Sequence, residues 1–237
     1  MVSSKFAILM CAEDSDYIKR AHGGYYGVYL RMLKEDGETW DVYHVAGGTF
    51  PADDVVGDYD GFIITGSCND AHGDDTWILT LLSLLHKLLA MEKKILGICF
   101  ALGGRVERSK TGWDIGITKV NLKNSRFPAR LEMPSSLSII ECHRDEVREL
   151  PREVEVLAWS EKTGVEMLVY GEHVVGIQGH PEYTKDILLH LIDRLITRNI
   201  IQESLGKEVK SKLGELFEAD TQAWKKLCMS FLKGRLS

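Results

Sequence analysis

A cysteine ends an apolar run in the stretch KKILGICFALGG (93–104), at a place where a strand could turn sharply into a helix. A nucleophile on such a turn needs small residues two positions before and after it, and Gly97 and Ala101 stand there. A helix N-terminus and a nearby imidazolium can lower a cysteine pKa from ~8.5 to between ~3.5 and ~7.5. Alone, the stretch slightly favours an apolar thiol ending a core strand. Cys99 is therefore a candidate nucleophile that needs support from other residues.

A histidine and an acid follow a second apolar run, in VVGIQGHPEY (174–183). His180 and Glu182 lie one residue apart in a loop closed by Pro181, so both can face one cleft. His180 could deprotonate a thiol while Glu182 holds the other ring nitrogen and stabilises the imidazolium. The alternative is a capping acid beside a loop histidine. The two motifs together favour catalysis more than either does alone.

A glycine follows a third apolar run, in FIITGSCNDAHGDD (62–75). Gly66 lets backbone approach a ligand closely, so its N–H or that of Ser67 could form an oxyanion hole with the N–H of Phe100. A plain turn is the alternative and the commoner role for such a glycine. Cys68, in the same stretch, ranks below Cys99 as a nucleophile because its loop is polar and leads into no helix at once.

Two further stretches contain histidine among polar residues. ECHRDEV (141–147) holds His143 and Asp145, and AHGGYYG (21–27) holds His22. Neither offers enough matched ligands for a metal, and the glycines beside His22 do not follow a strand as in a dinucleotide fingerprint. We expect both stretches to be solvated loops, and we assign no metal site.

The N-terminal half alternates strand-length apolar runs with stretches long enough for helices, which predicts parallel βαβ units. Ligands bind such doubly wound sheets beyond the carboxyl ends of the strands. Cys11, Thr65 and Cys99 all lie at predicted strand ends. The predicted strands are 5–11, 40–45, 61–65 and 93–98, and the predicted helices between them lie within 24–37 and 74–94.

From residue 112 the pattern changes to short β-rich runs joined by polar turns, which predicts antiparallel strands. Helices return after Pro181, over 184–200 and twice within 202–233. We therefore expect one α/β domain, 1–200, with a helical C-terminal extension, 201–237, packed on it. The predicted strands of this half are 115–122, 136–142, 153–160, 164–170 and 173–179.

The composition limits the class of partner. The chain has 237 residues, 44% of them hydrophobic, and a net charge of −6 with acids and bases interspersed. This pattern excludes the basic surface that binds a nucleic-acid backbone or an anionic membrane. No run is long enough for a signal-peptide core or a membrane span, so we expect a cytosolic (cytoplasmic) protein. Five scattered cysteines without CxxC pairs indicate thiols rather than disulfides.

The order ITGS (64–67), GICF (97–100) and GHPEY (179–183), each after an apolar strand, resembles the class I glutamine amidotransferase-like superfamily. The resemblance is strongest to the plant γ-glutamyl peptidases, through TGWDIGI, CHRDEVRELP, VEML and the tail WKKLC. It implies a doubly wound, mostly parallel, flavodoxin-like α/β sheet with a small antiparallel extension and C-terminal helices. It assigns Cys99 as nucleophile, His180 as base and acid, Glu182 as its orienter and Gly66 to the oxyanion side.

The same resemblance implies a reaction. Cys99 would attack a γ-glutamyl amide of a small molecule, such as a glutathione conjugate, and water would hydrolyse the resulting glutamyl thioester; no cofactor is implied. The family carries a GHQ stretch after the nucleophile, whereas here GICF runs directly into ALGG. Two alternatives stay open: a glutaminase-type amidotransferase component that needs a synthetase partner, and a catalytically impaired homologue.

Overall fold

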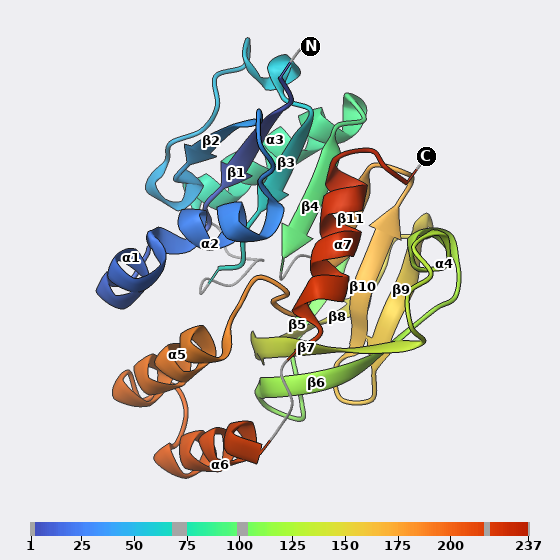
Figure 1. The fold of residues 1–237 in the computed structure, drawn as a ribbon. Helices are drawn as coiled ribbons and strands as arrows, with labels where there is room; N and C mark the ends of the chain where they lie inside the picture. Colours follow the sequence, from blue (N-terminus) through green and yellow to red (C-terminus); the bar gives the residue numbers. More distant parts are fainter. Residues whose placement is uncertain (1–2, 68–74, 99–103, 216–218, 237) are drawn as a thin grey trace.

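The computed structural model describes residues 3–67, 75–98, 104–215 and 219–236 (Figure 1). Within them the strands are β1 (Lys5–Leu9), β2 (Thr39–Tyr43), β3 (Gly61–Ile64), β4 (Lys94–Ile98), β5 (Arg105–Arg108), β6 (Asp114–Leu122), β7 (Ser136–His143), β8 (Asp145–Glu149), β9 (Val154–Ser160), β10 (Gly164–Tyr170) and β11 (Val174–Ile177). The helices are α1 (Asp16–His22), α2 (Gly24–Leu33), α3 (Thr76–Ala90), α4 (Arg126–Arg130), α5 (Lys185–Thr197), α6 (Glu203–Glu215) and α7 (Thr221–Leu232), with short 3₁₀ turns η1 (Val45–Gly47) and η2 (Val56–Asp58). None of these described helices is both long enough and apolar enough to cross a membrane.

Most of the described strands belong to one large sheet. Its nine strands run in the order β2-β1-β3-β4-β11-β10-β9-β6-β7. The first five are mutually parallel, and the last four pair antiparallel with their neighbours. β5 and β8 form a separate antiparallel pair. The predicted doubly wound, mostly parallel sheet with an antiparallel extension is therefore confirmed, and the extension continues the same sheet.

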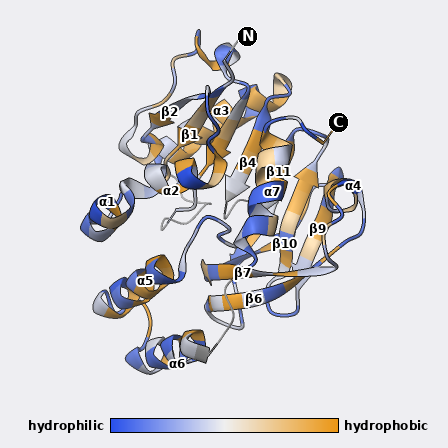
Figure 2. Cartoon of the chain, in the orientation of Figure 1, coloured by the Kyte–Doolittle hydropathy of each residue, from blue (hydrophilic) through white to orange (hydrophobic). Residues whose placement is uncertain are grey.

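Alternating side chains of the parallel strands pack into two hydrophobic layers, one on each face of the sheet. Phe6 and Ile8 of β1 join a cluster with α2, α5 and α7, whereas Ala7 and Leu9 join a second cluster with α3. This alternation follows from the two-residue period of a strand covered on both faces. Figure 2 shows hydrophobic colour along the central strands and mixed colour on α5 and α6.

Helix α7 lies against the sheet near β4 and contacts α2 and α4 (Figure 1). Trp224, Leu227 and Phe231 of this helix are almost completely buried in the same cluster as Phe6. α6 packs instead on α5 and β6. These contacts support our proposal that residues 201–237 are an extension packed on the α/β domain.

The structure differs from the predicted elements mainly at strand ends and in polar segments. The strand 164–170 occurs as predicted, but β1 ends at Leu9 and β11 ends at Ile177. The segments RVER (105–108) and DEVRE (145–149) form the β5–β8 pair, so the prediction of a solvated loop for ECHRDEV is wrong. Both segments consist mostly of charged residues, so they carry no clear hydrophobic periodicity, and their pairing partners are distant in sequence.

The junction of α1 and α2 depends on a glycine. A Cβ on Gly27, in the first turn of α2, would collide with the backbone carbonyl oxygen of His22. Overpacking costs about 1–3 kcal/mol, from which the gain of ~1 kcal/mol in helix propensity is subtracted. Gly27→Ala should therefore lower the melting temperature by up to roughly 8 °C in a thermal scan, at about 2–4 °C per kcal/mol.

A second helical glycine provides the matched control. At Gly214, in α6, no heavy atom of the described residues lies within 4 Å of a Cβ. Gly214→Ala should leave the melting temperature unchanged or raise it, because alanine favours the helix. Equal shifts for the two variants would contradict the close approach at Gly27.

Candidate active site

The loop that follows β11 is held on both sides by backbone hydrogen bonds. Gln178 N donates to the Glu166 carbonyl oxygen at 2.8 Å, and His180 N donates to the Ile140 carbonyl oxygen at 2.7 Å. Glu166 lies on the neighbouring strand β10, whereas Ile140 lies on β7, the last strand in the sheet order. The sheet therefore curls until β7 fixes the backbone of His180.

His180 and Glu182 face one another, as the sequence predicts. Nδ1 of His180 lies 2.9 Å from Oε1 of Glu182, and their side chains are 6% and 1% exposed. An ionised carboxylate only accepts hydrogen bonds, so Nδ1 must carry the proton. In the neutral ring Nε2 then keeps a lone pair and can accept a proton from a nucleophile.

A tyrosine missed by the sequence analysis supports the same carboxylate. The hydroxyl of Tyr29, on α2, donates to Oε1 of Glu182 at 3.1 Å. Burial, with the charge of Glu182 adding to it, raises the pKa of Tyr29 well above its usual value, so the hydroxyl stays a donor. Tyr29 belongs to the apolar stripe of a helix, and that pattern carries no signal of a contact with a residue 153 positions away.

A second tyrosine holds the imidazole by its face. The rings of His180 and Tyr183 are stacked with centroids 4.0 Å apart and planes 3° apart. Tyr183 is buried and lies next to Tyr25, at 6.0 Å between ring centroids. The sequence signal for Tyr183 is its position as the last residue of the GHPEY motif, which also contains His180. The ring is thus fixed by its backbone, by its Nδ1–H and by one face.

The carboxyl ends of β3, β4 and β11 lie level at one edge of the sheet. Ile64 pairs with Gly97, and Gly97 pairs with Gly176. Gly66 and Ser67 follow β3 at this edge and are half-buried, so their N–H groups come from the strand next to β4. Their part in an oxyanion hole stays a prediction.

Four residues of the sequence hypothesis lie outside the described residues: Cys99, Phe100, Ala101 and Cys68. Cys99 follows Ile98 in the chain, and Ile98 is the last residue of β4 and the register partner of Ile177 on β11. The chain therefore enters the nucleophile segment from the strand adjacent to the one that leads to His180.

Of the other cysteines, Cys11 was also expected at a strand end. It lies two residues past β1, is 3% exposed, and its backbone N donates to Thr65 Oγ1 at 2.9 Å. Burial raises the pKa of its thiol to about 12. Cys228, on α7, is also fully buried, and burial raises its thiol pKa as well. Both are protonated thiols of the core at neutral pH, unsuited to nucleophilic attack.

The histidines expected in solvated loops lie elsewhere. His22 is the last residue of α1, and its Nε2 lies 2.7 Å from Oδ2 of Asp186 at the start of α5. His143 is the last residue of β7 and is 5% exposed. The expectation of solvation is wrong for both: His22 pairs with a carboxylate 164 positions away, and His143 is buried, with Glu141 and the Asp145 carbonyl oxygen as close contacts.

The fold and the histidine–glutamate pair place the chain in a known class. The family described as "Glutamine amidotransferase class-I" matches residues 29–188, so the chain belongs to the class-I glutamine amidotransferases. A glutamine amidotransferase from Thermotoga maritima shares the fold with a TM-score of 0.70 and 20% identity, over 98% of this chain and all of the other. One from Methylobacillus flagellatus has a TM-score of 0.70 at 16% identity, over 100% and 96% of the chains.

Within this class the more similar curated sequences are plant proteins. Gamma-glutamyl peptidase 5 of Arabidopsis thaliana is 43% identical over 98% of this chain and 96% of its own length. Gamma-glutamyl peptidase 3 of the same plant is 40% identical over 97% of both chains. The similarity thus includes the helices after residue 200.

Proposed function

We propose that the chain hydrolyses γ-glutamyl amide bonds, with Cys99 as nucleophile, His180 as general base and acid, and Glu182 as the orienter of His180. The observation that carries the proposal is the buried His180–Glu182 pair, at 2.9 Å, in the loop after β11, the strand next to the one that precedes Cys99. The names of the two Arabidopsis relatives, each similar over nearly the whole chain, support the γ-glutamyl substrate.

The first half of the reaction forms a thioester. Nε2 of His180 takes the proton of the Cys99 thiol, and the thiolate attacks the carbonyl carbon of the γ-amide. The negative charge that develops on the carbonyl oxygen is stabilised by the N–H groups of Gly66 or Ser67 and of Phe100. The imidazolium, stabilised by Glu182, gives its proton to the leaving amine, so the C–N bond breaks and a γ-glutamyl thioester remains.

The second half releases glutamate. Nε2 of His180 accepts a proton from water as the water oxygen attacks the thioester carbonyl, and the thiolate leaves when the tetrahedral intermediate collapses. Glutathione conjugates and related small γ-glutamyl compounds are the substrates that we propose. Their γ-linkage is the bond that this sequence of steps breaks.

Mass spectrometry of the protein incubated with glutathione tests the proposal. We expect free glutamate and a glutamyl adduct on Cys99, and neither with Cys99→Ala. Cys68→Ala, which removes the rival thiol, should keep both. A folded wild-type protein that forms neither would refute the hydrolase. Hydrolysis of glutamine in preference to glutathione would instead favour a glutaminase component.

A further inference from the structure

Three buried ionisable side chains converge beside the loop that carries His180. Glu141 and His143 lie two residues apart on β7 and so share a face of that strand, and Glu166 comes from β10. One ligand atom from each lies within 4.8 Å of the others. All three residues are at most 5% exposed.

The cluster has unused hydrogen-bonding capacity. Among the described residues outside the cluster, no group hydrogen-bonds to either carboxylate oxygen of Glu141, to Nε2 of His143 or to Oε2 of Glu166; the Glu141 and Glu166 carboxyls lie within hydrogen-bonding reach of one another. Nε2 of His143 lies 3.1 Å from Oε2 of Glu141 as an ion-pair contact without hydrogen-bond alignment. Buried polar atoms without partners are costly, so these lone pairs point to a ligand.

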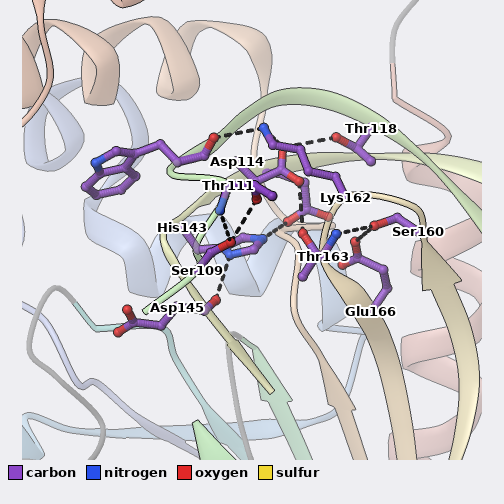
Figure 3. A network of polar contacts seen from close by, with 12 residues as sticks. Ser109, Thr111, Asp114, Thr118, His143, Asp145, Ser160, Lys162, Thr163 and Glu166 are labelled. Carbon is purple, nitrogen blue, oxygen red and sulfur yellow. Dashed lines mark hydrogen bonds and ion pairs between the residues drawn. The ribbon is translucent and has the colours of Figure 1, made fainter. Parts of the chain in front are cut away.

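Hydrogen bonds to groups outside the cluster orient two of its three side chains. Nδ1 of His143 donates to the backbone carbonyl of Asp145 at 2.9 Å, which leaves Nε2 directed at Glu141. The hydroxyl of Ser160 donates to Oε1 of Glu166, which leaves Oε2 for the cluster. Figure 3 shows His143 and Glu166 with these partners. Metal-binding histidines and carboxylates are held in this way, by a hydrogen bond on the atom that does not bind the metal.

An irregularity in the backbone of β10 also affects where the Glu166 side chain lies. The pairing of β9 with β10 shifts register between Val165 and Met167, so Glu166 stands at a β-bulge. Bulges redirect a side chain from its regular place on the sheet. Together with the curl of the sheet, the bulge is consistent with a group from β10, three places from β7 in the sheet order, joining the cluster.

The positively charged side chain of Lys162, near the cluster, is already paired with other groups. Nζ of Lys162 lies 3.1 Å from Oδ1 of Asp114 and 2.8 Å from the Trp113 carbonyl oxygen. The close contacts of Lys162 are therefore with groups outside the cluster.

We propose that Glu141, His143 and Glu166 bind a divalent transition-metal ion, with Zn²⁺ as the best match. One imidazole nitrogen and two carboxylate oxygens suit Zn²⁺, whereas Mg²⁺ and Ca²⁺ prefer six or more oxygen ligands. Tetrahedral ligands at ~2.0–2.2 Å from zinc lie roughly 3.3 Å apart, a spacing that His143 and Glu141 already have. Side-chain rotation of Glu166 brings in the third ligand.

The ion would act on structure near the active site. Glu141 follows Ile140, whose carbonyl holds His180 N, and a Cβ on Gly179 would collide with the carboxylate of Glu141. Binding at Glu141 would therefore fix β7 against the residue before His180. Its role is positional and requires no contact with substrate.

Calorimetric titration of chelator-treated protein with Zn²⁺ tests the proposal. The Cys99→Ala background keeps the proposed nucleophile from binding the metal and makes the result independent of turnover. We expect one Zn²⁺ per chain and a rise in melting temperature of roughly 5–10 °C at 100-fold excess over Kd. Mg²⁺ and Ca²⁺ should not compete.

Variants and a spectroscopic probe identify the ligands. Glu141→Gln should weaken Zn²⁺ binding at least about 100-fold while keeping the melting temperature of the metal-free protein, because it replaces a buried acid by a neutral isostere. His143→Asn should also lose binding, and the exposed Glu172→Gln should not. Co²⁺ bound at this site should show ligand-field bands without thiolate charge transfer. Absence of stoichiometric binding, binding that survives Glu141→Gln, or thiolate bands would each overturn the proposal.

Discussion

The His180→Ala protein is expected to lose at least about 10³-fold in kcat/KM for γ-glutamyl amides. Removal of a general base costs ~10²–10⁴-fold, and here the same ring also protonates the leaving amine. Its Nδ1 is committed to Glu182, so the described residues provide one imidazole on this loop with Nε2 available. Steady-state release of glutamate measures the loss.

A second readout separates this role from a loss of folding. The rate of Cys99 alkylation should have its pH midpoint well below ~8.5 in the wild type and should move toward that value in His180→Ala. His173→Ala is the matched control, because His173 immediately precedes β11, at the end of the strand opposite to His180. If His180→Ala keeps the wild-type alkylation profile and rate, His180 does not activate the thiol.

The Glu182→Gln protein is expected to lose about 10³–10⁴-fold in kcat, close to the ~10⁴-fold known for the corresponding change in a serine protease triad. The amide NH₂ can donate to Nδ1, which would place the ring proton on Nε2 and leave no lone pair for the nucleophile. The side chain keeps its size, so the stacked His180 and Tyr183 rings should stay in place. Single-turnover kinetics at saturating substrate measures the loss.

Removal of the Tyr29 hydroxyl, which also donates to Oε1 of Glu182, should lower kcat much less than Glu182→Gln does. Tyr29→Phe removes one donor but leaves the charge and the Nδ1 contact, so a loss of about tenfold is expected, equivalent to ~1.4 kcal/mol. Tyr26→Phe is its control, because the Tyr26 hydroxyl donates to the Trp40 carbonyl oxygen. A Glu182→Gln protein with more than a tenth of wild-type activity would contradict the orienting role.

Sequence patterns predict the parallel half of this fold because each strand carries its own apolar signal. They also predict the His180–Glu182 pair, since two residues separated by one position must lie close together. They do not predict Tyr29 beside Glu182 or Glu166 beside Glu141, because these contacts join elements brought together by the curl of the sheet and by a bulge. Local periodicity contains no information about either.

The acidic stretch around His143 shows a second limit. ECHRDEV has the composition of a surface loop, yet Glu141, His143 and Glu146 are each at most 5% exposed. Charged residues can be buried when other groups compensate them, and such groups need not be near in sequence. Here Glu166, the third member of the cluster with Glu141 and His143, lies on another strand. ECHRDEV alone offers too few ligands for a metal, and the third ligand that we propose, Glu166, lies on β10.

Helix α7 has a consequence for biosynthesis. Its buried residues complete the layer that covers β1 and β4, although those strands leave the ribosome more than a hundred residues earlier. Until Leu232 has been made, this face of the central sheet lacks the part of its cover that α7 provides, and exposed apolar strands are prone to aggregate. Nascent chains of this protein should therefore depend on chaperone protection until α7 has been made.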